Sequence, residues 1–251
     1  MRETRPVQGD ETDRLRAVLE HSERLSQLGK MAAGIAHEVG NPLAAISSIV
    51  QTLLAQTIDE AARERLQLVK EQVGRITAII RQLVEYSRPS TENRRLTDLN
   101  ELVRDAARLM RFEPRARGVD LTMELDDRLP PAAVVPHLLQ QVFLNLFQNA
   151  IDATEGRPWR AVRVHSRRVG DHAEFSVEDN GRGIPAADLE RIFDPFFTTK
   201  EPGRGTGLGL WICRGIVETL PGELTVDSVE GQGSVFTLRT RISHAPEHPG
   251  R

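Results

Sequence analysis

The chain has 251 residues and a formal net charge of −3, with 39% hydrophobic, 27% charged and only 4% aromatic residues. That length allows two modest domains with mainly aliphatic cores. The balance of charges gives no electrostatic argument for binding nucleic acid, and the single cysteine, Cys213, excludes an intrachain disulfide.

The segment shows no feature of a secreted or membrane-spanning protein. It has one cysteine, no apolar run that approaches the ~20 residues of a membrane span, and no signal peptide. We therefore expect it to work in the reducing cytoplasm without contacting a membrane. If the natural protein senses a signal across a membrane, that part lies outside this segment.

Two long amphipathic helices are expected at the start of the chain. Apolar and small residues recur in alternating steps of three and four over residues 15–53 and again over residues 66–83. The short break near residues 57–61 favours an antiparallel hairpin, which we place at residues 10–88. Two helices alone leave much of such long seams exposed, so a homodimeric four-helix bundle is expected, with packing against a second domain as the alternative.

The first of these helices carries the stretch AGIAHEVGNPL. His37 and Asn41 lie four residues apart, so they share a helical face, and Glu38 is next to the imidazole. A neutral imidazole nitrogen is a nucleophile near pH 7, and a neighbouring carboxylate can orient it or accept its proton. His37 falls one step past the apolar seam and is expected to point to solvent, while Pro42 predicts a kink just after it. Alone, such a His-Glu pair is more typical of an ordinary solvated surface.

A polar segment, residues 88–93, contains a helix-stopping proline and separates the hairpin from a second domain. Residue patterns there predict helices at 98–110, 138–154, 187–193 and 208–220, and strands at 119–125, 160–166, 172–178, 223–227 and 234–242. Asp98 or Asn100 is the expected cap of the first helix. The mixture of helices and hairpin strands predicts an α/β sandwich with helices on one face, so the fold class is α+β.

The helix QQVFLNLFQNAIDA carries Gln141, Asn145 and Asn149 at intervals of four residues. The three amides therefore lie in one stripe. An amide oxygen is a neutral, hard ligand that suits a magnesium ion which keeps several waters and bridges phosphates. An ordinary helix with polar exposed positions is the alternative explanation.

The stretch VEDNGRGIP places Asp179 after a strand, followed by Gly181 and Gly183, which allow sharp backbone turns. A carboxylate at this position can accept a hydrogen bond from an exocyclic amine such as that of adenine. The alternative is an ordinary Asp-Asn-Gly turn.

Glycines alternate at Gly205, Gly207 and Gly209 immediately before a helix, in the stretch RGTGLGL. Glycine permits close backbone approach, and the free amides and positive dipole end of a helix N-terminus can cradle phosphate. The spacing is not that of a Walker motif, and no strand precedes it as a dinucleotide fold requires.

The loop before these glycines contains FDPFFTTK, with three of the chain's eight phenylalanines within five residues. The cluster suggests a hydrophobic anchor for a mobile lid, although core packing is the preferred role of Phe193. Lys200 can reach a phosphate or be an ordinary exposed lysine.

Taken in this order, the stretches resemble the catalytic portion of bacterial sensor histidine kinases of two-component systems. AHEVGNPL resembles the H-box of the dimerisation and histidine phosphotransfer domain. NLFQNAIDA, EDNGRGIP, FDPFFTTK and GTGLGL resemble the N, G1, F and G2 boxes of the Bergerat-type (GHKL) ATP-binding domain, and GQGSVFTL resembles its closing hairpin. Gly40 and the stretch VVPHLL depart from the family pattern without touching its expected chemistry.

The resemblance implies roles for the matching residues. His37 would be the phosphoacceptor, Glu38 would help accept its proton, and Asn41 would orient a water or the regulator's aspartyl phosphate in the reverse reaction. Asn149 would bind Mg2+, and Asp179 would recognise adenine. The residues implied to surround ATP are Asn145, Asn149, Asp179, Gly181, Gly183, Lys200, Gly205, Thr206, Gly207, Leu208 and Gly209.

The same resemblance implies the domain organisation and the activity. The expected parts are a disordered N-terminus at 1–9, the phosphotransfer hairpin at 10–88, a linker at 89–98, the ATP-binding domain at 99–243 and a disordered tail at 244–251. The expected enzyme is a protein histidine kinase. It uses ATP and Mg2+ to phosphorylate its own His37 and passes the phosphoryl group to an aspartate in the receiver domain of a response regulator, with phosphatase activity toward that regulator.

Two other functions are compatible with this nucleotide fold. A GHKL ATPase without histidine kinase activity would need a catalytic glutamate in the helix at 138–154, where Gln140 and Gln141 stand and neither amide can act as a general base. A kinase-dead scaffold or a phosphatase is the other alternative, although every motif residue is intact.

Overall fold

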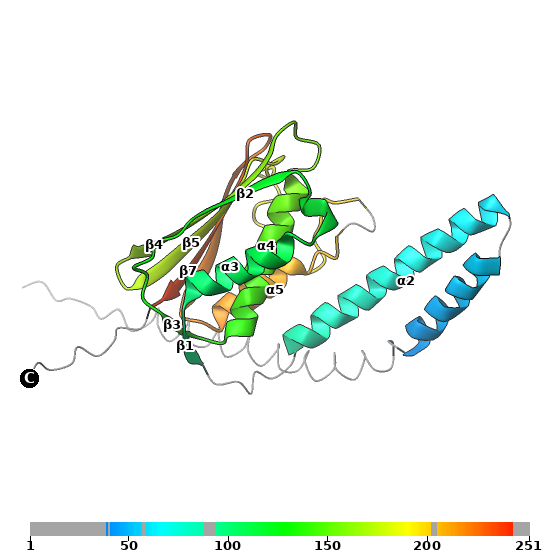
Figure 1. Cartoon of the computed structure of the whole chain (residues 1–251), viewed down its shortest axis with the longest axis horizontal. Helices are drawn as coiled ribbons and strands as arrows, with labels where there is room; N and C mark the ends of the chain where they lie inside the picture. The colour runs from blue at the N-terminus through cyan, green and yellow to red at the C-terminus, as the bar shows by residue number, and fades with distance from the viewer. Residues whose placement is uncertain (1–38, 40, 57–58, 88–93, 202–204, 243–251) are drawn as a thin grey trace, which may run out of the picture. The chain divides into compact units, whose positions relative to one another are not determined.

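In the computed structural model, the described residues are 39, 41–56, 59–87, 94–201 and 205–242. They form a helical unit at the start of the chain, to which the loop residues 198–201 and 205–208 also belong, and an α/β unit (Figure 1). The expected α+β class is confirmed. Among the described residues, no helix is long and apolar enough to cross a membrane.

The helical unit contains a helix over residues 41–56 and α2, Glu60–Ser87. The carboxylate of Asp59 accepts the N–H of Ala62 at 3.2 Å, which caps the start of α2. The N-terminal part of the long first helix, the kink after His37, the outward orientation of His37 and the break at residues 57–58 all fall outside the described ranges.

The apolar seam of the helical unit is only partly buried within one chain. Among its described positions, Leu43, Val50 and Val73 are buried, whereas Ile46, Leu53, Val69 and Ile76 are each 42–43% exposed. A row of exposed apolar side chains at heptad spacing is a surface suited to pack against further helices.

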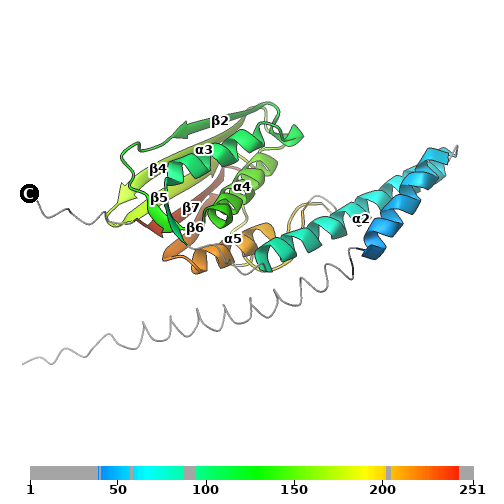
Figure 2. The same ribbon diagram turned by 60° about the horizontal axis from the view of Figure 1, so that its bottom comes forward.

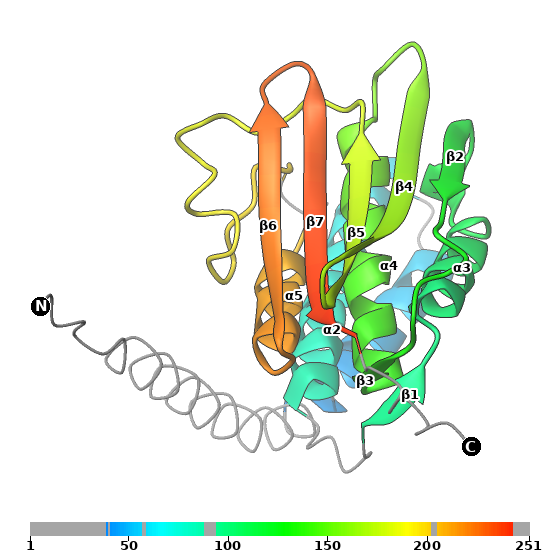
Figure 3. The same cartoon turned by 90° about the vertical axis from the view of Figure 1, so that its left-hand side faces the viewer.

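The α/β unit is built on a five-stranded sheet with the strand order β2-β4-β5-β7-β6, in which β2 runs parallel to β4 and all other neighbours are antiparallel. The strands are β2 (Val119–Glu124), β4 (Arg160–Val169), β5 (His172–Asp179), β6 (Gly222–Val229) and β7 (Gly233–Arg241). One face is covered by α3 (Leu99–Met110), α4 (Pro136–Ala153) and α5 (Gly209–Glu218), and a short 3-10 turn, η1 (Pro114–Ala116), follows α3 (Figures 2 and 3). Apart from η1, each of these elements agrees with the sequence prediction within a few residues.

Strand alternation gives the sheet one apolar and one polar face. On the helical side, Phe175 and Val177 of β5 are buried, and the Phe175 ring meets Phe143 of α4 edge to face, with centroids 5.3 Å apart. Glu174 and Ser176 alternate with them and face the other side. Truncation of a buried phenylalanine costs roughly 3–5 kcal/mol, so the Phe143 contact is a main attachment of α4 to the sheet.

Asp98 is the cap of α3. Its carboxylate accepts the backbone N–H groups of Asn100 at 2.8 Å and Glu101 at 3.3 Å. Asn100, the other candidate, is buried: its side-chain oxygen accepts the hydroxyl of Ser166 at 2.9 Å, and its amide donates to the carbonyl of Asp126 at 2.9 Å. This polar network fixes α3 against the sheet.

The residue pattern does not predict two short strands, β1 (Arg95–Thr97) and β3 (Ala132–Val134), which pair antiparallel. β1 lies within the stretch 89–98 that is expected as a linker. A strand of three residues is too short to show alternation, which explains the difference. Just before β1, Arg94 donates to the carbonyl of Thr219 after α5, at 2.5 Å.

The helix predicted at residues 187–193 is wrong. The segment forms successive i→i+3 turns, in which the N–H of Asp188 bonds to the carbonyl of Pro185 and the N–H of Arg191 to that of Asp188. It is too short to sustain a helix on its own, and Pro195 disfavours helical backbone at the residue before it.

Candidate nucleotide-binding site

α4 carries the amide side chains expected at the site. Gln141 and Asn149 are half-buried, whereas Asn145 is buried and donates from its amide nitrogen to the carbonyl of Gly209 at 3.4 Å. Gly209 is the first residue of α5 and the last of the predicted phosphate loop. The fold therefore brings these two predicted site residues, Asn145 and Gly209, together.

Within the described ranges, no group of three or more His, Cys, Asp or Glu side chains could hold a metal ion. A cation near α4 would depend on amide oxygens, phosphates and waters, which is a ligand set that suits Mg2+. The half-buried amide of Asn149 fits that set better than Asn145, which is buried and bonded to α5.

Asp179 ends β5 and is only 3% exposed. Its side chain lies on the same, helical side of the sheet as those of Phe175 and Val177, because alternate residues of a strand share a face. In the sheet, Asp179 is paired with Ser234 at the start of β7. Its Oδ1 accepts the N–H of Gly181 at 2.8 Å. Burial raises the pKa of Asp179 to about 6; Glu178 adds to this rise, whereas the N–H groups of Gly181 and Ser234 and the charge of Arg157 oppose it.

The hydrogen bond from Gly181 to Asp179 is also the mark of an ordinary Asx-turn, so it does not distinguish the two explanations for this stretch. The burial of Asp179 favours a site over an ordinary turn, because aspartates are mostly exposed and desolvated carboxylates are common at functional sites, so its role in binding adenine stays a prediction. Asn180 instead extends the pairing with β4: its side-chain oxygen accepts the N–H of Ala161 at 2.9 Å, and its amide donates to the carbonyl of Trp159 at 2.8 Å.

Gly181 and Gly183 occupy positions where no side chain fits. A Cβ on Gly181 would lie 2.5 Å from the carbonyl oxygen of Ala153 at the end of α4. Gly183 has a φ of +69°, and a Cβ there would lie 2.1 Å from the carbonyl oxygen of Val229. The turn after β5 is therefore held between α4 and the β6–β7 hairpin.

Two further residues shape this turn, and sequence reasoning does not identify either. Gly233 has a φ of +120°, and a Cβ there would lie 2.0 Å from the carbonyl oxygen of Asp179. The guanidinium of Arg157 donates to the carbonyl of Gly181 at 2.6 Å and to that of Gly231 at 2.5 Å. In the sequence, the GQG stretch of the last hairpin is the only sign of the close approach of Gly233 to Asp179. No sequence pattern points to Arg157.

The predicted phosphate loop precedes α5. Gly207 has a φ of +68°, a conformation that side chains other than glycine rarely adopt. The N–H of Leu208 donates to the hydroxyl of Thr206 at 3.3 Å. A Cβ on Gly205 would lie 3.1 Å from the side chain of Lys200, so these two predicted site residues adjoin each other.

The phenylalanines of FDPFFTTK do not form a buried core. Phe196 is 65% exposed and has a φ of +66°, which is strained for a residue with a side chain. Phe193 and Phe197 are half-buried, and the guanidinium groups of Arg214 and Arg191 lie 5.8 Å and 4.7 Å from their respective ring centroids. The core role expected for Phe193 is therefore wrong.

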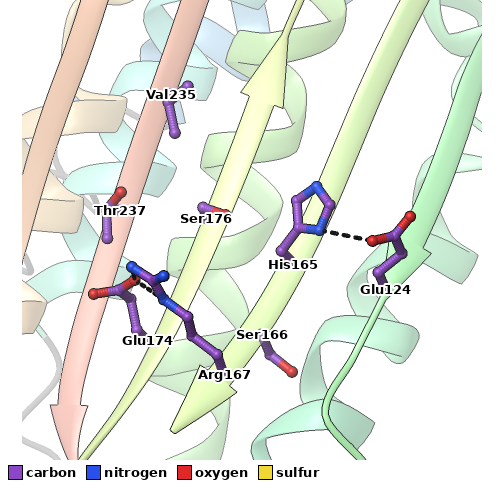
Figure 4. A pocket seen from close by; sticks show the side chains of 8 residues that line it. All are labelled: Glu124, His165, Ser166, Arg167, Glu174, Ser176, Val235 and Thr237. Carbon is purple, nitrogen blue, oxygen red and sulfur yellow. Dashed lines mark hydrogen bonds and ion pairs between the residues drawn. The ribbon is translucent and has the colours of Figure 1, made fainter. Parts of the chain in front are cut away.

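A hollow of about 500 Å³ lies on the other, polar face of the sheet (Figure 4). It is lined by Glu124, His165, Ser166, Arg167, Glu174, Ser176, Val235 and Thr237. Its polar side chains pair with one another: Nδ1 of His165 lies 3.3 Å from the Glu124 carboxylate, and Arg167 binds Glu174. Asp179 faces the opposite side of the sheet, so this hollow is not the predicted nucleotide site.

Glu174 is buried on this polar face between two arginines. Nε of Arg239 lies 2.6 Å from one carboxylate oxygen, and Arg167 binds the other. Burial disfavours the charged form, but the hydrogen bonds from Arg239 and Arg167 outweigh it and lower the pKa of Glu174. The charge of this carboxylate is therefore neutralised within the fold.

The predicted phosphoacceptor, His37, and its neighbour Glu38 lie outside the described residues. Asn41 is described and is exposed in the helix over residues 41–56. The geometry of these three side chains relative to one another stays a prediction.

Comparison with known proteins decides the family. Residues 27–92 match the family model described as His Kinase A (phospho-acceptor) domain, and residues 134–244 match the one described as Histidine kinase-, DNA gyrase B-, and HSP90-like ATPase. The chain is 40% identical over 218 residues to the signal transduction histidine-protein kinase AtoS of Escherichia coli (strain K12). The chain belongs to the sensor histidine kinase family.

Solved structures of histidine kinases share the fold of this family member. Full-length ShkA in complex with AMPPNP matches with a TM-score of 0.67 at 25% identity, over 87% of this chain and 47% of the ShkA chain. Histidine kinase ThkA in complex with response regulator protein TrrA matches with a TM-score of 0.64 at 28% identity, over 94% of this chain and 68% of that one. The alignment with AtoS covers 86% of this histidine kinase chain and 35% of AtoS, so the chain spans about a third of that relative.

Proposed function

We propose that this chain is the catalytic portion of a sensor histidine kinase that phosphorylates its own His37 with ATP and then transfers the phosphoryl group to an aspartate of a response regulator. The observation that carries the proposal is Asp179, a buried carboxylate beside a turn whose glycines leave no room for side chains. Such a group is suited to accept a hydrogen bond from the exocyclic amine of adenine. Membership of the family supports the same activity.

We assign the two ends of ATP to different elements. Asp179, Gly181 and Gly183 would hold the adenine end. The residues that would hold the phosphates are Asn145, Lys200, Gly205, Thr206, Gly207, Leu208 and Gly209, where the N-terminus of α5 offers free amides and a positive dipole end. Asn149 would hold Mg2+, which supplies charge stabilisation on the transferring phosphoryl group.

The proposed reaction has two transfers. In the first, an imidazole nitrogen of His37 attacks the γ-phosphorus in line; the N–P bond forms, the bond to the β,γ-bridging oxygen breaks, ADP leaves and the ring proton passes to Glu38. In the second, a carboxylate of the regulator takes the phosphoryl group as the N–P bond breaks. In a phosphatase reaction, Asn41 would orient the water that hydrolyses the regulator's aspartyl phosphate.

We further propose that the kinase is a homodimer. The exposed seam residues of the helical unit offer an apolar surface that a second copy would bury in a four-helix bundle. A regulator as partner is supported by the ThkA–TrrA complex. Because the substrates are ATP and a receiver domain, we expect this segment to act in the cytoplasm.

Incubation of the purified chain with γ-labelled ATP and Mg2+ tests the proposal. We expect a protein-bound label that is acid-labile and base-stable, and that disappears in His37→Ala. His172→Ala, which removes an exposed histidine of β5, is the matched control and should keep full labelling.

Three outcomes would contradict the proposal. A label that persists in His37→Ala would place the phosphoryl group on another side chain. Release of phosphate without labelled protein would favour the GHKL ATPase, and no turnover at all would favour a scaffold.

A further inference from the structure

Arg157, in the connection between α4 and β4, joins two turns that lie far apart in the sequence: the turn after β5 and the turn of the β6–β7 hairpin. Its Nη2 donates to the carbonyl of Gly181, in the turn after β5, at 2.6 Å. The same nitrogen donates to the carbonyl of Gly231, in the turn between β6 and β7, at 2.5 Å. One guanidinium group therefore holds both turns.

These turns need such a link because glycine gives them their shape. Glycine has the greatest backbone freedom of any residue, so a glycine-rich turn keeps one conformation only through contacts with its surroundings. Backbone bonds provide part of this: the N–H of Arg182 donates to Ala153 at 3.0 Å, and the N–H of Gly231 donates to the carbonyl of Arg182 at 2.7 Å. Arg157 adds two charge-assisted hydrogen bonds, which are stronger than neutral ones.

The connection that carries Arg157 is itself fixed at the end of α4. Nε of Arg160 donates to the hydroxyl of Thr154 at 3.1 Å, and its other nitrogens donate to the carbonyls of Ile151 and Arg117, each at 3.1 Å. The backbone N–H of Arg157 donates to the carbonyl of Thr154, also at 3.1 Å. Arg157 therefore extends from a rigid base.

The charge of Arg157 also reaches Asp179. It lowers the pKa of this carboxyl, against the effects of burial and of the neighbouring Glu178. An amine donates a stronger hydrogen bond to an ionised carboxylate than to a neutral carboxyl group. The guanidinium thus favours both the shape of the turn and the ionised form of Asp179.

We propose that Arg157 is a positioning residue for adenine recognition: by holding the carbonyl groups of Gly181 and Gly231, it fixes the turn beside which Asp179 presents its carboxylate to the exocyclic amine. The inference rests on the proposed binding of ATP at Asp179. Arg157 acts at the adenine end of the nucleotide, so its loss weakens nucleotide binding and leaves the transfer rate from bound ATP unchanged.

The test compares three substitutions of Arg157 in the 251-residue chain. Arg157→Ala removes donors and charge, Arg157→Lys keeps the charge, and Arg157→Gln keeps donors without charge. The matched control is Arg168→Ala, which removes an exposed β4 arginine whose Nε donates to Gly170 in its own hairpin. The Kd for ADP is measured by titration calorimetry across a range of pH, and KM and kcat are measured for autophosphorylation with ATP.

We expect Arg157→Ala to raise the Kd for ADP and the KM for ATP about tenfold, the factor that corresponds to about 1.4 kcal/mol, with kcat unchanged. Arg157→Lys should recover to within about threefold of the wild type, and Arg168→Ala should equal it. The pH profile gives a readout that a merely structural role would not move. The acid limb of ADP binding is the range of low pH in which protonation of Asp179 weakens the affinity for ADP. Loss of the Arg157 charge raises the pKa of Asp179, so this limb should move to higher pH in the Ala and Gln variants. It should stay in place in the Lys variant, which keeps the charge.

An unchanged Kd and an unchanged acid limb in Arg157→Ala would overturn the inference while leaving the proposed function intact, provided that the wild type binds ADP. A wild-type chain that fails to bind ADP would overturn both. Should Arg157→Ala fail to fold by circular dichroism, Arg157→Gln decides the question, because it removes the charge and shortens the side chain but retains an amide donor. An unchanged Kd and an unchanged acid limb in Arg157→Gln would then overturn the inference.

Discussion

Two buried carboxylates of the same strand, Glu174 and Asp179 of β5, have opposite electrostatic environments. Glu174 faces the polar side of the sheet, where Arg167 and Arg239 bind it and lower its pKa. Asp179 faces the helical side, where burial dominates and raises its pKa to about 6. Two carboxylates that are almost equally buried therefore differ in their partners: the charge of Glu174 is compensated by two arginines of the fold, whereas the charge of Asp179 is destabilised by burial.

The two carboxylates also give stability opposite responses to pH. The pKa of Asp179 lies above its ordinary 3.8, so the folded chain retains a proton that the unfolded chain releases. That contribution to stability is complete below about pH 4 and is lost as the pH rises to about 6. The pKa of Glu174 is lowered from its ordinary 4.5, so its contribution is present above that value and is lost as the pH falls through the folded-state pKa.

Asp179→Asn should have the largest effect. Removal of the ionised acceptor should weaken ADP binding roughly 100-fold and abolish autophosphorylation. The proposed site accepts a hydrogen bond from the amine of adenine, and an asparagine amide lacks the charged oxygen that accepts it. The same change removes a buried charge, so the free energy of unfolding at pH 7.5 should rise by about 1–3 kcal/mol. Titration with ADP and unfolding in urea measure the two effects, and a variant less stable than the wild type would contradict the comparison.

Acidification of the wild type should have the next largest effect. Below about pH 6, ADP affinity should fall about tenfold per pH unit as Asp179 becomes protonated. Over the same range, the gain in stability of Asp179→Asn over the wild type should shrink, because both side chains are then neutral. A gain that stays constant between pH 7.5 and pH 4.5, measured by urea unfolding, would assign the stabilisation to another cause.

Glu174→Gln should destabilise the fold without affecting the site. It leaves two guanidinium groups without their carboxylate, and because Arg167 and Arg239 are partly exposed to solvent, we expect a loss of only about 1–2 kcal/mol in the free energy of unfolding at pH 7.5. The Kd for ADP should remain within about twofold of the wild type. A large change in Kd would show that the two faces of the sheet are not independent.

Glu178→Gln is expected to have the smallest effect. Its ion pair with Arg163, at 3.7 Å, is exposed, and such pairs contribute about 0–1 kcal/mol. Glu178 is also one of the causes that raise the pKa of Asp179, so its loss should move the acid limb of ADP binding to lower pH. Movement in the other direction would contradict the assigned cause.

Sequence patterns predicted the parts of the site that lie within one segment. Asp179 and its two glycines follow one strand, and the amides of Asn145 and Asn149 follow one helical repeat, so local spacing was enough to place them. Gly233 and Arg157 could not be found in this way, since their roles depend on which turns, distant in the sequence, meet in space.

The fold could be predicted to a similar extent. The long helices and the five strands of the main sheet show clear periodicity, whereas β1 and β3 are too short to show any. The composition of residues 187–193 predicts a helix, and only the hydrogen bonds show that the segment forms successive turns. Exposure of the helical seam within one chain follows from its length, whereas the particular residues left exposed follow only from the structure.

The short ladder between β1 and β3 has a mechanical consequence for the α/β unit. β1 follows Arg94, which bonds to the carbonyl after α5, and β3 runs directly into α4. Tension applied to the chain at Arg94 is therefore divided between the start of α4 and the end of α5, because only short connections separate them from this point. A pull on the chain at this point therefore acts on α4 and α5, the two helices that carry Asn149 and Gly209 of the predicted site.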